Sequence, residues 1–298
     1  MERQVIEAAL ATVRPNTSIE ARSHASSSLE TWTRTEHTSN NNISNGGGDA
    51  AISTWETYAR LLHLFFDNNS NGNNNNTRSH DYVENIALET PSLSMAAMQS
   101  EAMGAKLLIL TMLHAKVRRD FRALMSHRPD VALAIRDTIN ISLTYLGQRI
   151  SRGGSSGGGG GDSGLVAPLC SSAAAVAVRH GGGGIAELVE VARSSLAASN
   201  GGPSSQNSNL IPSIALVVLS CLPEEAQASD MGAAEVDKAL YSSVGQALEA
   251  TYVSLVRSLS GGANSDIPTC LKVLEHWCGP CHVTLSQLNV PLAVADAG

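Results

Sequence analysis

Residues 107–124 read Leu-Leu-Ile-Leu-Thr-Met-Leu-His-Ala-Lys-Val-Arg-Arg-Asp-Phe-Arg-Ala-Leu. Apolar side chains recur in this stretch every three or four residues, at Leu110, Leu113, Val117, Phe121 and Leu124. That spacing places them on one face of a helix, with His114, Arg118 and Arg122 on the opposite face. The stretch predicts an amphipathic helix with one buried face, which ends a longer helical segment over Leu93–Leu124.

The same spacing recurs on both sides of this segment, in stretches of helical length and without a convincing strand pattern. We therefore expect about ten helices in series, the others over Met1–Val13, Ser18–Thr35, Ile52–Phe66, Pro129–Ile150, Leu165–His180, Ile185–Leu196, Leu210–Leu222, Val236–Leu259 and Ile267–Trp277. The first of these should end at Arg14, because a residue before proline avoids the helical conformation. In the second, Ile19, Ala25, Leu29 and Trp32 are predicted to face inward.

Stretches rich in Asn, Gly and Ser separate the helical segments at residues 39–49, 68–76, 153–164, 181–184 and 199–209. Such composition buries too little apolar surface to offset its ordering entropy, so we expect disordered loops. A phosphate-binding loop at 153–164 is disfavoured, because no Gly-Lys-Ser/Thr follows it and no strand precedes it.

Paired helices that repeat about every 40 residues, once the loops are discounted, favour an all-α fold of the α-solenoid type. A compact helical bundle is the competing architecture. The 298 residues, of which 43% are hydrophobic, supply ample apolar mass for a core in either case.

Charge, apolar runs and cysteine content narrow the possible environment and partners. A net charge of −7 argues against a dedicated nucleic-acid binder, and the longest apolar runs are too short to span a bilayer. The acidic first residues do not resemble a signal peptide. Five cysteines, at positions 170, 221, 270, 278 and 281, do not suggest a disulfide framework, so we expect a cytosolic or nuclear protein.

Three ordered stretches carry a more specific likeness. In the first, Ala21–Trp32, Thr54–Glu56 and Leu61–Leu62 precede Glu101–Phe121, which ends Lys-Val-Arg-Arg-Asp-Phe. In the second, Val166–Val178 is followed by Ile211–Glu225, which ends Leu-Ser-Cys-Leu-Pro-Glu-Glu. The third, Cys270–Trp277 with the following Val283–Leu288, contains Lys-Val-Leu with a tryptophan three residues later.

These stretches resemble the importin-beta superfamily of nuclear transport receptors, most closely the branch that contains transportin-SR. The resemblance implies HEAT-type antiparallel helix pairs, with an importin N-terminal-like module over residues 1–125 and further repeats over 126–298. Members of the family continue for many more repeats, so the likeness implies that residues 1–298 are an N-terminal part. It also implies no catalysis and no cofactor.

The resemblance further implies partners: the small GTPase Ran in its GTP form, protein cargo and nuclear pore proteins, with shuttling between cytoplasm and nucleus. Ran docks on the second helices of the N-terminal pairs in that family, so the likeness points to a contact patch of Lys116, Arg118, Arg119 and Arg122. The alternative interpretation of these four residues is a solvated helix face. A HEAT-type scaffold that does not bind Ran is the alternative function.

Residues 277–282, Trp-Cys-Gly-Pro-Cys-His, match both a thioredoxin active-site string and a haem-attachment string. Redox chemistry at Cys278 and Cys281 is disfavoured, because a helical pattern rather than a strand precedes the string and few residues follow it. Covalent haem lacks a second axial ligand, and zinc would need a fourth ligand besides Cys278, Cys281 and His282, with His276 the nearest candidate. We expect a tight turn at Gly279–Pro280 between two helices.

The acids Glu224 and Glu225 follow Pro223 at a predicted helix end, where negative charge opposes the helix dipole. A partner-facing role and two simply solvated acids both remain open for this pair.

Overall fold

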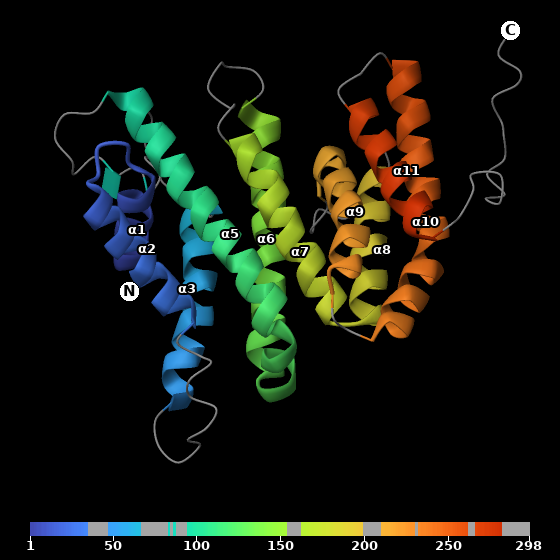
Figure 1. Ribbon diagram of the computed structural model, residues 1–298. Helices are drawn as coiled ribbons and strands as arrows, with labels where there is room; N and C mark the ends of the chain where they lie inside the picture. The colour runs from blue at the N-terminus through green and yellow to red at the C-terminus, as the bar shows by residue number, and fades with distance from the viewer. Residues whose placement is uncertain are drawn as a thin grey trace, which may run out of the picture. The chain divides into compact units, whose positions relative to one another are not determined.

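The computed structural model describes residues 1–34, 47–66, 83, 86–87, 94–153, 162–198, 210–229, 232–261 and 266–281. Throughout this part of the chain the regular secondary structure is helical, as predicted. The helices are α1 (Glu2–Val13), α2 (Ile19–Arg34), α3 (Gly47–Phe66), α5 (Met95–His127), α6 (Pro129–Gly153), η2 (Asp162–Leu165), α7 (Val166–Arg179), α8 (Gly182–Ala198), α9 (Pro212–Gln227), α10 (Ala233–Gly261) and α11 (Ile267–Cys281) (Figure 1).

The chain divides into two compact units, residues 1–172 and 173–298, and the boundary falls inside α7. In the first unit α1 packs on α2 and α5, and α6 packs on both α3 and α5. Arg128 alone joins α5 to α6, so the chain reverses there and the two helices are antiparallel neighbours. Residues 126–153, predicted to belong to the later repeats, therefore pack with the first helices.

The core of the first unit draws on α1, α3, α5 and α6. The predicted inward residues of α5 are buried, apart from the half-buried Leu124, and Trp55, Tyr58 and Leu62 of α3 are buried as well. The largest side chains of this core are aromatic: Trp55, Tyr58, Phe65, Phe66 and Phe121. Trp55 meets Phe121 edge to face at 6.4 Å, which joins α3 to α5.

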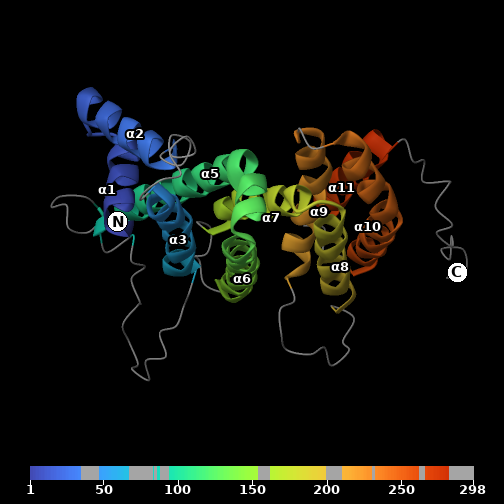
Figure 2. The ribbon, with the colours of Figure 1, turned by 90° about the horizontal axis from the view of Figure 1, so that it is seen from below.

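In the described residues of the second unit, two consecutive helix pairs follow the end of α7. α8 packs against α9, and α10 packs against α11. The two pairs stack through equivalent helices: the first helices, α8 and α10, pack together, and so do the second helices, α9 and α11 (Figures 1 and 2). This arrangement of stacked pairs is compatible with a helical solenoid.

The start of α2 corrects one prediction. Ala25 and Leu29 are buried as expected, but Ile19 is 85% exposed. Residues 18–21, at the start of α2, are exposed, so none of the described residues covers the apolar side chain there. Periodicity predicts the inward face of a helix, but not how far along its length a neighbour reaches.

Two glycine-containing runs predicted as loops are partly helical. Gly47–Asp49 open α3, and Gly182–Gly184 form the first turn of α8. The run at 153–164 begins on the last residue of α6 and ends within η2. The predicted loops over 39–46, 68–76, 154–161 and 199–209 lie outside the described residues.

Gly181 lies in the short connection between α7 and α8, and Gly182–Gly184 begin α8. Gly181 has φ +88°, a left-handed conformation that glycine adopts at little cost. A Cβ on Gly184 would lie 2.5 Å from the carbonyl oxygen of Ala177 and 2.8 Å from Cβ of His180. The turn therefore brings α8 too close to α7 for any side chain at this position.

We expect Gly184→Ala to lower the free energy of unfolding by about 1–3 kcal/mol, because the added methyl group overlaps α7. Gly183→Ala is the matched control, since a Cβ there meets nothing within 4 Å. That substitution should be neutral or stabilise by up to about 1 kcal/mol, because alanine favours the helix. Chemical denaturation followed by circular dichroism measures both, and equal effects would contradict the close approach.

Two C-terminal predictions are also corrected. Pro223 does not end its helix, because α9 continues to Gln227. Gly279 and Pro280 do not form a turn between helices, because α11 continues through them to Cys281. The predicted segment over 283–288 lies outside the described residues.

Candidate functional site

The basic residues singled out from the sequence lie on the C-terminal half of α5, and the structure separates them into two groups. Lys116 is fully buried, and Arg119 is about one-third exposed. Arg118 and Arg122 are exposed. The interpretation of all four as one surface patch is therefore wrong for Lys116.

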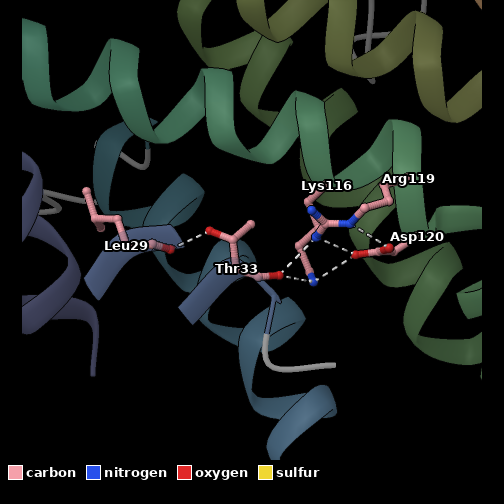
Figure 3. A network of polar contacts seen from close by, with 5 residues as sticks. All are labelled: Leu29, Thr33, Lys116, Arg119 and Asp120. Atoms are coloured by element: carbon pink, nitrogen blue, oxygen red, sulfur yellow. Dashed lines mark hydrogen bonds and ion pairs between the residues drawn. The ribbon is translucent and has the colours of Figure 1, made fainter. Parts of the chain in front are cut away.

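Lys116 points toward the end of α2 (Figure 3). Its Nζ donates to the carbonyl oxygen of Thr33 at 3.3 Å and pairs with Oδ2 of Asp120 at 3.3 Å. The same ammonium lies 4.9 Å from the ring centroid of Trp55, within cation–π range. A carboxylate, a carbonyl and an aromatic face thus replace the water that a buried ammonium loses.

Arg119 completes the cluster from the solvent side. Its Nε and Nη2 donate to Oδ1 and Oδ2 of Asp120 at 2.9 and 2.8 Å, which is the fork geometry of an arginine–carboxylate pair. Nη2 also donates to the carbonyl oxygen of Thr33 at 3.0 Å. This carbonyl belongs to the last turn of α2, where backbone acceptors lack partners within the helix and cations are favoured.

Asp120 is 7% exposed and lies between the two cations. Burial alone would raise the pKa of its carboxyl group, but the hydrogen bonds from Arg119 and the charge of Lys116 outweigh that effect. The pKa of Asp120 therefore lies below its ordinary value, and the carboxylate stays ionised. The cluster of Lys116, Arg119 and Asp120 ties α2 to α5.

An open pocket of about 300 Å³ adjoins this cluster, between α2 and α5. Leu29, Leu108, Met112 and Ala115 supply apolar lining, and Arg119 stands at its edge. No pattern in the sequence predicted this pocket, because its walls come from helices that are distant along the chain.

A second polar arrangement lies in the other unit, around Pro223 of α9. Proline has no N–H, so residue 223 cannot donate the usual helical bond to the carbonyl of Leu219. The indole Nε1 of Trp277, from α11, donates to that carbonyl at 2.7 Å. The neighbouring Nδ1 of His276 lies 2.9 Å from the carbonyl oxygen of Ser220. Two successive α11 residues therefore contact adjacent backbone carbonyls of α9, one turn before the proline.

The two acids after Pro223 have different environments. Glu224 is exposed and lies 3.4 Å from Nδ1 of His276. Glu225 is buried, with its Oε2 3.9 Å from Nη1 of the buried Arg179. The interpretation of both as solvated acids is therefore wrong for Glu225.

The environment of Cys278 works against a reactive thiolate. Burial raises the pKa of its thiol. The residue also lies in the last turn of α11, where the helix dipole disfavours negative charge. The described residues hold no group of three or more His, Cys, Asp or Glu that could bind a metal ion. The Cys281 side chain and His282 lie outside the described residues.

Comparisons of the chain with protein-family models, with curated proteins and with solved structures find no match. In the described ranges, no helix is both long enough and apolar enough to cross a membrane.

The structure adds Thr33, Trp55 and Asp120 to the residues considered from the sequence. One local signal could have revealed part of this cluster, because Lys116 and Asp120 stand four residues apart, the spacing of a helical ion pair. The contacts to Thr33 and Trp55 join segments more than fifty residues apart and leave no such local signal.

Proposed function

We propose that the chain is a helical-repeat transport receptor of the importin-beta type. Its first unit binds the GTP form of the small GTPase Ran, and the protein carries cargo through the nuclear pore, in the import direction, as it shuttles between cytoplasm and nucleus. The observation that carries the proposal is that the sequence stretches which resemble this family form contacts within the first stretch and between the other two.

The first such contact lies within the first stretch. The Lys-Val-Arg-Arg-Asp-Phe string of α5 holds the end of α2 through Lys116 and Arg119, and Phe121 packs on Trp55 of α3. The second contact joins the other two stretches, because Trp277 donates to the Leu219 carbonyl. Residues that pack together must fit one another in size and polarity. Finding both members of a contact in these stretches therefore supports a shared helical architecture more strongly than separate sequence matches would.

The packing of the second unit supports HEAT-type pairs. Consecutive helices pair, and each pair stacks on the next through equivalent helices. The same packing suits a Ran-independent scaffold that binds other proteins, so nucleotide selectivity is the property that separates the two functions.

The expected GTPase contact includes fewer residues than the four proposed from the sequence. Lys116 and most of Arg119 hold α2 in place, whereas Arg118 and Arg122 are exposed four residues apart, on one face of α5. We assign the contact to Arg118 and Arg122, with cargo and pore proteins on other surfaces.

The test is a pull-down of the purified chain against Ran loaded with GTP or with GDP. We expect selective retention of the GTP form. The affinity should be at least tenfold weaker in Arg118→Glu/Arg122→Glu, because two positive charges at the proposed contact become negative. The matched control is Arg128→Glu/Arg136→Glu, which makes the same charge change on residues paired with Asp130 and Asp137.

The control should bind Ran as the parent chain does. Equal retention of both nucleotide forms, or none, would overturn the transport proposal and favour the scaffold. An equal loss in both double variants would show that total charge, not the α5 surface, is responsible.

A further inference from the structure

We infer that residues 283–295 pack on an apolar stripe of α10 and α11 and so cap the outer side of this helix pair. The stripe consists of Tyr241, Tyr252, Leu255, Val256 and Leu259 of α10 together with Leu271 of α11. The inference does not depend on Ran, because it concerns the second unit alone. It follows from the position and charge of the stripe and from the composition and reach of the segment that follows α11.

The α10 part of the stripe lies on the side of the helix that faces away from α8. Ala250 lines a small pocket together with Leu196 of α8, and Arg257 Nη1 donates to the Leu196 carbonyl oxygen at 3.2 Å. These contacts define the α8 side of α10. Tyr252 and Leu259 each follow one of these residues by two positions, which is about 200° around a helix. They therefore project roughly opposite to α8.

The α11 part of the stripe faces away from α9 in the same way. Trp277 donates to the Leu219 carbonyl of α9, and Val273, one turn earlier on that face, is fully buried. Leu271 precedes Val273 by two residues and is exposed, and Glu275 supplies a charge beside it at the border of the stripe. Since α8 and α9 form the preceding pair, the exposed sides of α10 and α11 both lie on the side of the stack away from that pair.

The α10 part of the stripe is accessible and uncharged. The three most exposed members of the whole stripe, Tyr241, Leu259 and Leu271, each keep more than half of their surface accessible. The charges nearest to it on α10 are directed at α8: Glu249 lines the small pocket there, and Arg257 bonds to the α8 backbone. Exposed apolar surface of this kind is typical of an interaction site.

The segment that follows α11 matches the stripe in chemistry. Residues 283–295 read Val-Thr-Leu-Ser-Gln-Leu-Asn-Val-Pro-Leu-Ala-Val-Ala, with no charged side chain and with six valines or leucines among thirteen residues. Packing such a segment on an uncharged apolar surface removes both from water and leaves no charge unpaired. A highly charged partner would gain less from the same surface.

The segment also begins close to the stripe. α10 and α11 pack together and have 29 and 15 residues, so α11 returns along about half of α10 and ends beside its middle (Figure 1). The stripe runs for about 27 Å from Tyr241 to Leu259, whereas thirteen extended residues span up to about 45 Å. A short tether gives an effective concentration on the order of mM, which a second copy of the chain would have to reach free in solution. The tethered segment is therefore the favoured occupant.

The test is photo-crosslinking in the full chain, with the variant Leu288→p-benzoylphenylalanine. Chains labelled with nitrogen-15 are mixed with an equal amount of unlabelled chains, so that mass spectrometry separates crosslinks within one chain from crosslinks between two. We expect crosslinks within one chain, to the peptides of α10 and α11 that contain the stripe.

Leu259→Asp/Leu271→Asp places two charges in the stripe and should reduce these crosslinks at least tenfold. The matched control is Val191→Asp/Val253→Asp, which makes the same charge change at two exposed valines outside the stripe and should change the yield less than twofold. Circular dichroism and thermal melting check that each variant keeps the parent fold.

Deletion of residues 283–298 gives an independent measurement. The dye ANS binds exposed apolar surface, so its fluorescence should rise at least twofold in the shortened chain, and Leu259→Asp/Leu271→Asp should remove that rise. Crosslinks mainly between chains would assign the stripe to a second copy and overturn the inference. Equal losses in the two double variants, or crosslinks that reach neither α10 nor α11, would overturn it as well.

Discussion

Replacing Asp120 by alanine is expected to destabilise the first unit by about 3–5 kcal/mol. The substitution removes the carboxylate that pairs with the fully buried ammonium of Lys116 and with the guanidinium of Arg119. Lys116 then keeps a charge in the protein interior, near the Thr33 carbonyl and the Trp55 ring but without this carboxylate. Urea denaturation of the parent and variant measures the difference.

Asp137→Ala is the matched control. Asp137 also follows an arginine and pairs with it, at 3.0 Å from Nη2 of Arg136, but its side chain is 58% exposed. Exposed pairs contribute little, so this substitution should cost about 0.5 kcal/mol or less. Lys116→Met/Asp120→Ala should be more stable than Asp120→Ala alone, because no buried ammonium is left without its carboxylate. A similar cost for the two aspartates would show that Lys116 is not buried in solution.

The pH dependence gives a second readout of the same contact. A carboxyl group whose pKa is lowered by folding contributes stability that is present above its unfolded pKa, about 3.9, and lost as the pH falls through its lower folded pKa. The stability difference between the parent and Asp120→Asn should therefore shrink as the pH falls below about 4. A difference that grew toward acid would mean that folding raises this pKa.

The burial of Lys116 could not be predicted from the sequence. The apolar period of α5 predicts the faces occupied by Leu113, Val117 and Phe121, because that period is local to one helix. A lysine beside that face is normally solvated. Its burial depends on the carbonyl of Thr33 and the ring of Trp55, and these arrive from segments 83 and 61 residues earlier in the chain.

Composition likewise gave the wrong answer for the glycines at 181–184. A run of glycines loses more conformational entropy on folding than other residues do, and composition alone indicates only this cost. The spatial requirement at Gly184 is set by the approach of Ala177 and His180 across the turn. The run is ordered, because Gly182–Gly184 begin α8, and at Gly184 the Ala177 carbonyl and His180 lie too close for a side chain.

Trp277→Phe is expected to lower the free energy of unfolding of the second unit by about 2–4 kcal/mol. Phenylalanine retains a ring in this fully buried position but cannot donate to the Leu219 carbonyl, 2.7 Å from the indole nitrogen. Pro223 cannot supply the missing donor. A buried carbonyl without its donor costs about 1–3 kcal/mol, and the smaller ring adds a packing loss. Thermal or chemical unfolding gives the total.

Trp32→Phe separates the hydrogen bond from the change in ring size. The indole nitrogen of Trp32 has no hydrogen-bond partner among the described residues, although its ring packs at a tilt against Tyr58, with the ring centroids 4.8 Å apart. The same substitution at this half-buried position loses only ring contacts and should cost about 1 kcal/mol or less. Equal costs at the two tryptophans would mean that the Trp277 hydrogen bond contributes nothing measurable.

Pro223→Ala then tests why α9 needs a donor from α11. An alanine at 223 brings its own N–H four residues after Leu219, so the carbonyl can be satisfied inside the helix. In this background Trp277→Phe should cost about 1–2 kcal/mol less than in the parent chain, which is a coupling between residues on two different helices. Additive effects would show that the proline and the tryptophan act separately. A positive coupling means that Pro223 of α9 and Trp277 of α11 act together. The proline removes the backbone N–H that would bond to the Leu219 carbonyl, and the indole of the neighbouring helix replaces it.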